Sequence, residues 1–271
     1  MGKKKIGFQG IKGCNSSVAA KKYTKSMDQV GFRTFKEIFK ELEKNNLTLG
    51  ILPVENSLTG GVIEVNKLLI KKDVKIVGEL KLPITYALLS YEDRTIEEMD
   101  KVFSHPQALS QCSHFLSNHD LEVIPHFDTA GAAKMLAEEE KRKACAIART
   151  ECSDLFNLHQ ITNEIENNDE NKTRFVIISK SGEQKGDKAS VVFSVPHKPG
   201  SLQRILKVFE DHNINLTRIE SVPITNQSWK YYFFLDFELK DERQQNFQLI
   251  VNILEKKVNY FNSLGCYYAH K

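Results

Sequence analysis

The chain has 271 residues and a mass of 31.0 kDa, and its 41% hydrophobic content is enough to bury one large core or two medium ones. Lys and Arg number 38 against 35 Asp and Glu, and the resulting net charge of +3 argues against a nucleic-acid-binding protein. No apolar run approaches the roughly 20 residues that span a bilayer. The start at Met1–Lys5 leads into a strand-like segment rather than a signal peptide, so we expect a cytoplasmic protein without a membrane partner.

The pattern of the five cysteines argues against a small domain that is stabilised by disulfides or by a zinc ion. Their number is odd, they are scattered along the chain, and no C-x-x-C pair occurs among them. Neither a disulfide framework nor a zinc site follows from such a pattern. We therefore expect reduced thiols and no metal ion at Cys14, Cys112, Cys145, Cys152 and Cys266.

Residues 5 to about 178 have the pattern of an α/β domain with a largely parallel sheet, because short apolar runs alternate with amphipathic stretches. Helices are expected between the strands. Thr34 with Glu37 forms a capping box, and Pro106 suits the first turn of a helix. The expected strands are Lys5–Gln9, Leu47–Pro53, Val74–Leu89, Lys101–Ser104, Leu121–Phe127, Ala144–Ala148 and Thr173–Ser179.

Residues 180–187 contain no large apolar side chain and form the expected linker. Beyond them the predicted order is the ferredoxin-like βαββαβ arrangement. The strands are Ala189–Val195, Leu216–Val222, Trp229–Leu239 and Gly265–Ala269, and the helices are Gly200–His212 and Arg243–Val258. The sequence thus predicts two domains, residues 1–180 and 188–271, with crossovers between two lobes of the first near 78–83 and 160–173.

Four junctions in the first domain share one design, in which the chain leaves a strand, passes small polar residues and enters a helix. In an open α/β sheet the carboxyl ends of the strands face the ligand crevice, and each helix start offers unpaired backbone N–H groups. Such a set favours an anion, and the absence of both G-x-x-x-x-G-K-[ST] and G-x-G-x-x-G favours a small carboxylate over a phosphate. The junctions are Gly10–Ser17, Glu55–Gly61, Ser104–Gln107 and Asp128–Gly131.

Thr173 and Arg174 place a hydroxyl and a guanidinium side by side where an apolar strand begins. A guanidinium binds a carboxylate through two parallel hydrogen bonds, so Arg174 suits an anionic ligand. These positions also have plainer interpretations. Considered alone, Arg174 could form an ion pair at the surface, and Glu55 could be a structural carboxylate that bonds backbone N–H groups. His105 fits a helix cap rather than a metal ligand, and Cys14 is either a loop filler or a thiol with a lowered pKa.

Four segments, in this order and spacing, resemble the prephenate dehydratase / arogenate dehydratase family: GILPVENSLTGGV, FSHPQALSQC, DTAGAAKMLAE and NKTRFVIIS. A further segment, FSVPHKPGSLQRILKVFEDHNINLTRIESVP, is similar to the regulatory ACT domain of that family. The resemblance covers nearly the whole chain. It implies a two-lobed, periplasmic-binding-protein-like catalytic domain followed by a ferredoxin-like ACT domain.

The resemblance implies an enzyme of phenylalanine biosynthesis that converts prephenate to phenylpyruvate, or arogenate to phenylalanine, without a metal or organic cofactor. By similarity, Thr173 assists the departure of the ring hydroxyl, Arg174 pairs with a substrate carboxylate, and Phe175 helps to exclude water. The remaining substrate-binding residues that the family pattern implies are Ser16, Glu55, Asn56, Ser57, Ser104, His105, Gln107 and Thr129.

An ACT domain implies phenylalanine as an effector, bound at the interface of a homodimer or homotetramer. The residues implied for this site are Pro199, Gly200, Ser201, Leu202, Asn215, Leu216, Glu220 and Ser221. Ser201 stands where the family usually has alanine and Val222 where it usually has arginine, so inhibition by phenylalanine is less firmly implied than catalysis. In the first loop Ile11, Cys14 and Asn15 replace the usual residues, which is expected to alter how that loop covers the substrate.

A function of another class stays open, namely a non-catalytic cytosolic sensor of an amino acid or carboxylate with the same two-lobed cleft. A solute-binding protein would need export, and the sequence predicts no signal peptide. A sensor has no need of Thr173, Arg174 and Phe175 together, which favours the enzyme. The preference between prephenate and arogenate is left open, and so is a second domain that only dimerises.

Overall fold

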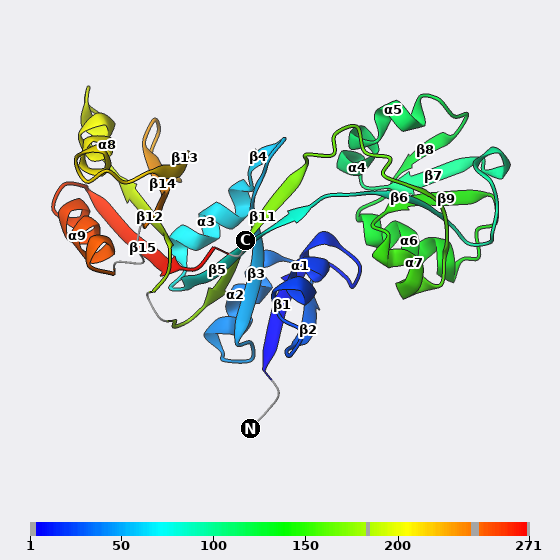
Figure 1. Cartoon of the computed structure of the whole chain (residues 1–271), viewed down its shortest axis with the longest axis horizontal. Coiled ribbons are helices and arrows are strands. Elements are labelled where there is room, and N and C mark those ends of the chain that lie inside the picture. Colours follow the sequence, from blue (N-terminus) through cyan, green and yellow to red (C-terminus); the bar gives the residue numbers. More distant parts are fainter. Residues whose placement is uncertain (1–3, 183–184, 240–243, 270–271) are drawn as a thin grey trace. The chain divides into compact units, whose positions relative to one another are not determined.

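The computed structural model describes residues 4–182, 185–239 and 244–269 (Figure 1). The chain divides into two units. The first unit contains residues 1–37, 56–58 and 82–173, and the second contains residues 38–55, 59–81 and 174–271. One crossing between the units falls at the peptide bond that joins Thr173 to Arg174. Within the described ranges, no helix has both the length and the apolar character needed to cross a membrane.

The first unit begins with a β-α-β segment. β1 (Lys5–Gln9) and β2 (Asp28–Phe32) are parallel neighbours, and α1 (Asn15–Tyr23) connects them. β1 has the predicted bounds. β2 is absent from the predicted strands because Asp-Gln-Val-Gly-Phe has no apolar run and its residues stay partly exposed.

A five-stranded sheet forms the rest of this unit. Strand β7 is parallel to β8 and β9, whereas β6 is antiparallel to β9 and β10. In spatial order the strands are β10 (His159–Asn163), β6 (Ala87–Ser90), β9 (Ala144–Ala148), β7 (Lys101–Ser104) and β8 (Glu122–Pro125). The buried side chains of Leu88, Val102 and Ile147 share one hydrophobic core.

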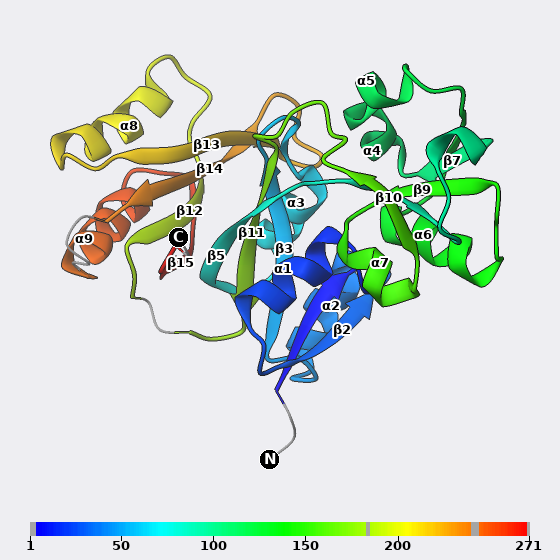
Figure 2. The same ribbon diagram turned by 45° about the vertical axis from the view of Figure 1, so that its right-hand side comes forward.

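Helices of this unit follow the ends of its strands. They are α4 (Pro106–Gln111), α5 (Ser113–Leu116), α6 (Thr129–Glu138) and α7 (Glu151–Phe156), with a short 3-10 helix, η1 (Ile96–Glu98). Helix α6 packs on β9 and against α7 (Figure 2). The helix predicted to begin at Pro106 does so, but it is interrupted at Cys112 and resumes as α5.

The second unit has a central group of strands. The neighbouring strands are β3 (Leu49–Asn56), β11 (Lys172–Ser179) and β5 (Lys75–Pro83), and the short β4 (Gly60–Gly61) pairs with β3. Two helices belong with them, α2 (Phe35–Glu43) and α3 (Ile63–Lys71). The predicted capping box at α2 is confirmed, since Glu37 Oε2 accepts from the Thr34 N–H and Thr34 Oγ1 accepts from the Glu37 N–H.

The single strand predicted over 74–89 is wrong. It is two strands, β5 and β6, separated by residues 84–86. Pro83 has no N–H to continue a ladder, and near this point the chain passes from one unit to the other. Periodicity alone does not reveal such a change of sheet, because both strands are equally apolar.

The C-terminal part of the second unit has the predicted βαββαβ order. Its elements are β12 (Lys188–Ser194), α8 (Ser201–Asp211), β13 (Leu216–Pro223), β14 (Tyr231–Glu238), α9 (Gln244–Glu255) and β15 (Tyr260–Tyr267). The strands form an antiparallel sheet in the order β13-β14-β12-β15. Both helices pack on the same side of this sheet (Figure 1), where Phe209, Phe237 and Ile250 share one core.

Two boundaries in this part differ from the predicted ones. The last strand begins at Tyr260 rather than Gly265, which instead lies at an irregularity in the pairing with β12. Arg243, the predicted first residue of the last helix, lies outside the described residues, as do linker residues 183–184. The α/β class and the βαββαβ order are confirmed.

Candidate functional site

The Thr173 hydroxyl, at the start of β11, accepts a hydrogen bond from Asn56 Nδ2 at 3.1 Å. The same nitrogen also lies 2.7 Å from Asn171 Oδ1 and 3.2 Å from the Lys172 carbonyl oxygen, so its two hydrogens are shared among three acceptors. Asn56 is only 8% exposed. A hydroxyl that accepts a bond from an amide keeps its own hydrogen for a further partner. The arrangement is compatible with the donor role predicted for Thr173, which stays a prediction.

Ser57 ties the segment after β3 to the segment that leads into β11. Its backbone N–H donates to the Lys172 carbonyl at 2.9 Å, and its hydroxyl accepts from the Lys172 N–H at 2.9 Å. Asn56 Oδ1 accepts from the Leu58 N–H at 3.1 Å, a turn that asparagine favours. Three predicted site residues, Asn56, Ser57 and Thr173, are therefore brought together by segments more than a hundred residues apart.

Asn171 belongs to this group although its role was not predicted from the motifs. It is 1% exposed, and its Oδ1 atom is the shortest contact of the Asn56 amide. The polar run at residues 166–171 predicts only a turn. Its last asparagine, directly before an apolar strand, is the one signal, because such a side chain readily bonds nearby backbone or amide groups.

Ser104 and His105 are engaged in local hydrogen bonds. The Ser104 hydroxyl is fully buried and donates to the Ile147 carbonyl at 2.6 Å, which joins β7 to β9. His105 caps α4, since its Nδ1 accepts from the Gln107 N–H at 3.2 Å. The plainer interpretation of His105 as a helix cap is confirmed, while substrate contacts from Ser104, His105 and Gln107 stay predictions.

All four predicted junctions lead into helices, at Asn15, Ile63, Pro106 and Thr129. At the last of them the Asp128 Oδ1 atom accepts from the Ala130 N–H at 2.8 Å, so half-buried Thr129 is the first helical residue. Ser16, 6% exposed, lies in the first turn of α1. The helix starts are confirmed, but whether they bind an anion stays a prediction.

Cys14 does not have a lowered pKa. It is 8% exposed, its Sγ atom lies 3.4 Å from the Gln9 carbonyl oxygen to which it donates, and burial raises its pKa to about 12. The possibility of a reactive thiol in the first loop is therefore wrong, because desolvation outweighs the N–H groups of the helix start. The loop-filler interpretation is confirmed.

Arg149 is a second buried residue that the motifs do not reveal. It follows β9 directly, is 6% exposed, and donates from Nη1 to Asn15 Oδ1 at 3.2 Å and to the Pro83 carbonyl at 2.9 Å. Its Nε donates to Glu151 at 3.1 Å. Asn15, one of the departures from the family pattern, is thus held by a buried arginine.

Arg174 lies in the second unit and its guanidinium is bonded to three protein groups. Nε donates to Glu79 Oε2 at 2.7 Å, Nη1 to Asp236 Oδ2 at 2.5 Å, and Nη2 to the Tyr267 hydroxyl at 3.1 Å. Arg174 is 6% exposed and Phe175 beside it is 1% exposed. The surface ion pair considered for Arg174 is wrong, and its pairing with a substrate carboxylate stays a prediction.

The charges around Arg174 stabilise one another. Burial alone raises the pKa of Asp236, but the guanidinium groups of Arg174 and Arg218 outweigh that effect and hold this pKa below its usual range. Burial likewise lowers the pKa of Arg174, whereas Asp236, Tyr267 and Glu79 raise it well above its ordinary value. Both groups therefore stay charged near neutral pH.

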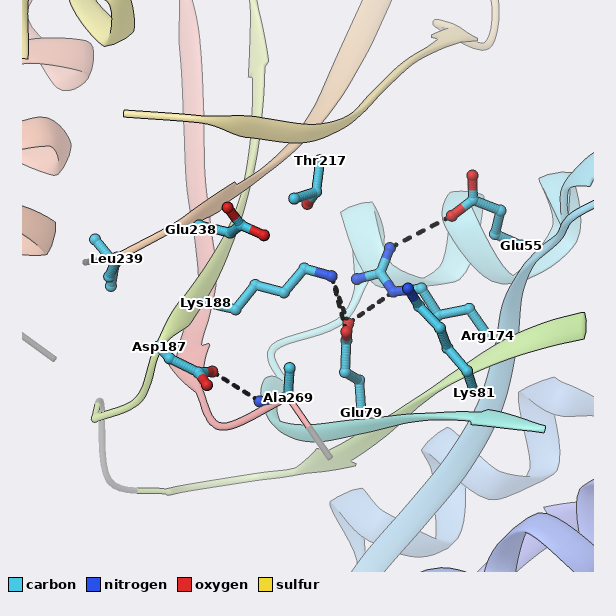
Figure 3. A pocket seen from close by; sticks show the side chains of 10 residues that line it. All are labelled: Glu55, Glu79, Lys81, Arg174, Asp187, Lys188, Thr217, Glu238, Leu239 and Ala269. Carbon is cyan, nitrogen blue, oxygen red and sulfur yellow. Dashed lines mark hydrogen bonds and ion pairs between the residues drawn. The ribbon is translucent and has the colours of Figure 1, made fainter. Parts of the chain in front are cut away.

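A cavity of about 400 Å³ opens beside these residues (Figure 3). In it Arg174 and Lys188 both point at the Glu79 carboxylate, and Glu55 lies 3.6 Å from Arg174 Nη1. Groups of both charge signs line it, which favours a polar or zwitterionic occupant over an apolar one. The lining residues are Glu55, Glu79, Lys81, Arg174, Asp187, Lys188, Thr217, Glu238, Leu239 and Ala269.

The residues predicted to bind phenylalanine lie at two places in the βαββαβ part. Pro199, Gly200, Ser201 and Leu202 surround the start of α8, and Asn215, Leu216, Glu220 and Ser221 belong to β13 or precede it. Gly200 has φ +75°, a left-handed conformation that suits glycine. Their effector contacts stay predictions.

Glu220 has partners of its own. Its carboxylate accepts from Asn66 Nδ2 of α3 at 3.0 Å and pairs with Arg218. A Cβ atom at Gly61 would collide with the same carboxylate, so a larger residue there would require the Glu220 side chain to move. Glu220 therefore contacts α3 and β4 within this unit.

In the part of the chain that the structure describes, no group of three or more His, Cys, Asp or Glu side chains could hold a metal ion. All five cysteines are free thiols and all are buried.

Comparisons with known sequences agree over most of the chain. The family model described as prephenate dehydratase matches residues 6–183, and the ACT domain model matches residues 189–246. The prephenate dehydratase of Methanocaldococcus jannaschii is 37% identical over 266 residues, covering 94% of this chain and 95% of that protein. Arogenate dehydratase 2 of Petunia hybrida is 34% identical over 283 residues, covering 97% of this chain and 71% of that protein.

Solved structures share the fold. GqqA, described as a novel type of quorum quenching acylase, superimposes with a TM-score of 0.89 at 26% identity, covering 98% of both chains. Prephenate dehydratase from Arthrobacter aurescens in complex with L-Phe has a TM-score of 0.88 at 23% identity, covering 97% of this chain and 90% of that chain. At that identity the second likeness shows a common fold.

Proposed function

The chain belongs to the prephenate dehydratase family, and we propose that it converts prephenate to phenylpyruvate, arogenate to phenylalanine, or both. Relatives that are 37% and 34% identical carry these two activities in their names, so the choice of substrate is left to experiment. Within the site, the hydrogen bond from Asn56 to Thr173 is the observation that carries the proposal.

The proposed reaction breaks two bonds that join substituents to the ring, the C–C bond to the carboxylate and the C–O bond to the hydroxyl. The ring carboxylate leaves as CO2, the hydroxyl on C4 leaves as water after taking up a proton, and the electron pair of the broken C–C bond completes the aromatic ring. Aromatisation supplies the driving force, so the protein has mainly to orient the substrate and assist the leaving hydroxyl. No redox change occurs that would call for an electron acceptor.

Thr173 is the proposed donor to the leaving hydroxyl. A threonine is a very weak acid, so it acts as a positioned hydrogen-bond donor rather than as a titrating group. Accepting from Asn56 occupies one lone pair of its oxygen and leaves the hydrogen for the substrate. Polar contacts to the substrate carboxylates are proposed for the helix-start residues Ser16, Gln107 and Thr129.

A regulatory division of the chain is also part of the proposal. Residues 1–180 would form the catalytic domain and residues 188–271 an ACT domain that binds phenylalanine in a homodimer or homotetramer. The match of residues 189–246 to the ACT model supports this. A cytoplasmic location is proposed with it, which suits a chain whose five cysteines are all free.

A second candidate is hydrolysis of an acyl amide, because the likeness to GqqA reaches 26% identity over 98% of both chains. A hydrolase needs an activated nucleophile. Burial raises the pKa of Cys14 and Cys152 to about 12, so neither thiol offers one. The dehydratase is preferred because the prephenate dehydratase model matches residues 6–183 and relatives of 37% and 34% identity carry the dehydratase activities in their names. Acyl-amide hydrolysis and binding without turnover are outcomes of the same assay.

The decisive experiment is steady-state kinetics of the purified protein on prephenate and on arogenate, with an N-acyl amide as a third substrate. Thr173→Ala is expected to lower kcat by about 10²- to 10⁴-fold, because the donor to the leaving group is lost. Its melting temperature should change little, since the side chain is only half-buried and makes one hydrogen bond.

Thr173→Ser is the matched control, because it keeps the hydroxyl and should retain most of the activity. A Thr173→Ala variant with unchanged turnover would refute the role assigned to this residue. Turnover of the acyl amide alone would establish the second candidate instead.

A further inference from the structure

A buried ionic cluster surrounds Arg174, and the proposed reaction does not account for it. The Arg174 cluster consists of Glu79 on β5, Arg174 on β11, Lys188 on β12, Asp236 on β14 and Tyr267 on β15, with exposures between 1% and 7%. Charged groups are rarely buried to this degree unless they are paired. Three of the five residues come from the sheet of the βαββαβ part.

Asp236 makes the shortest contact in the Arg174 cluster. Its Oδ2 atom lies 2.5 Å from Arg174 Nη1 and 3.9 Å from Arg218 Nη1. A hydrogen bond between two charged groups is stronger than a neutral one and fixes direction as well as distance. Lys188 Nζ lies 2.8 Å from Oε1 of Glu79, the other carboxylate of the cluster. Two positive charges are thus paired with two negative ones, and the guanidinium is held in place without a net charge in the cluster.

The hydrogen bonds that hold the Arg174 guanidinium also restrain the backbone of β11. Arg174 follows Thr173 directly, and successive side chains of a strand point to opposite faces. Fixing the guanidinium on one face therefore restrains the peptide bond between the two residues, and with it the direction of the Thr173 side chain on the other face. A displacement of about 1 Å at a reacting group can lower a rate about 10²-fold.

We propose that Asp236 is a positioning residue for the dehydration: by clamping the Arg174 guanidinium it sets the orientation of the Thr173 hydroxyl. This inference rests on the proposed function. It assigns Arg174 to a carboxylate of the protein rather than of the substrate. It also gives β14, a strand of the expected regulatory domain, a part in catalysis without any contact to the reacting atoms.

The kinetic test uses Asp236→Asn, which keeps the shape of the side chain and removes its charge. We expect kcat to fall about tenfold while KM stays within about twofold, because alignment and not substrate affinity is lost. Leu235→Ala is the matched control. Leu235 precedes Asp236 on β14 and is fully buried in the core of the same sheet, so this variant loses stability without touching the cluster.

A double-mutant cycle tests whether Asp236 acts through Arg174. The double variant Asp236→Asn/Arg174→Lys should be no slower than Arg174→Lys alone, since the link is already broken. Fully additive losses in kcat would overturn the proposal. If Asp236→Asn does not fold, Tyr267→Phe takes its place, with a smaller expected loss of about threefold. It removes the hydroxyl that is bonded to Arg174 Nη2 and to the Ser190 hydroxyl.

Hydrogen exchange of the backbone N–H groups of residues 172–176 provides a readout that needs no substrate. In Asp236→Asn we expect exchange at these residues to rise more than in the rest of the sheet, whereas in Leu235→Ala it should rise only as far as the lower global stability requires. Unchanged exchange in Asp236→Asn, or losses of kcat in both variants that simply follow their melting temperatures, would overturn the proposal. A wild-type protein that converts neither substrate would sink the proposed function, while the exchange comparison would still decide whether Asp236 holds β11.

Discussion

Single side chains in this protein are placed by partners distant in the sequence. Thr173 is held by Asn56, and Arg174 by Glu79, Asp236 and Tyr267. Neighbours in the chain thus belong to separate hydrogen-bond networks on opposite faces of one strand. A motif in which hydroxyl and guanidinium stand side by side does not mean that both groups meet one ligand.

The buried thiols give a prediction at this scale. Burial raises the pKa of Cys145 to about 12, whereas an exposed thiol has a pKa near 8.5. Above about pH 9 the unfolded chain loses this proton while the folded chain keeps it until about pH 12, so the folded state loses stability as the pH rises through that window. Urea unfolding at pH 7, 9 and 10 should therefore show a free energy of unfolding that falls steeply above pH 9.

Cys145→Ser is the comparison that isolates this thiol. Serine does not titrate and can keep the hydrogen bond to the Lys101 carbonyl, which Sγ makes at 3.2 Å. The alkaline slope should become shallower by about 1.4 kcal/mol per pH unit. Identical slopes in the two proteins would mean that the folded state does not protect the proton.

At the scale of helices and strands, the helix starts are both predicted by local capping residues and close to the predicted substrate contacts. Asp128 caps the start of α6, His105 caps the start of α4, and the capping box of Thr34 and Glu37 lies at the start of α2. Each cap satisfies backbone N–H groups that would otherwise lack partners. Residues beside such starts recur among the predicted substrate contacts because a helix start suits an anion.

Asp128→Ala tests the cap of α6. It removes the acceptor of the Ala130 N–H and should destabilise the protein by about 1 kcal/mol. For a chain of this length that corresponds to a melting temperature about 2 °C lower. Asp128→Asn keeps an acceptor oxygen and should lie close to wild type; an equal loss in both variants would point to the charge instead.

For the molecule as a whole, the proposed regulation by phenylalanine predicts that this amino acid binds to and stabilises the folded protein. A ligand that binds only the folded state stabilises it by about 2.7 kcal/mol at a hundred times its dissociation constant. L-Phenylalanine should therefore raise the melting temperature by several degrees, and D-phenylalanine at the same concentration should not. Light scattering with and without L-phenylalanine should show a dimer or tetramer.

No shift even at high concentration would argue that Ser201 and Val222, which depart from the family pattern, have removed the effector site. Glu220 already has partners in Arg218 and Asn66. A shift would therefore direct attention to the start of α8 and to Asn215 rather than to Glu220.

The sequence by itself determined the features that depend on short-range patterns. These are the α/β class, the βαββαβ order, the starts of α2, α4 and α6, and the family. The helix starts and the single strands and helices follow from capping residues and hydrophobic periodicity within about 15 residues. The βαββαβ order and the family follow from the succession of such segments along the chain.

Only the tertiary structure decided which polar groups meet. Asp236 lies in an apolar strand and Glu79 in another, and nothing local says that both bond Arg174. The buried pairing of Asn56 with Asn171 was likewise beyond prediction. The edge strand β2 was missed because it lacks an apolar run, and a crossover was expected near 78–83 without the division into β5 and β6. For the polar groups the physical reason is that burial removes the water that would otherwise satisfy them, so their partners are fixed by the packing of distant segments.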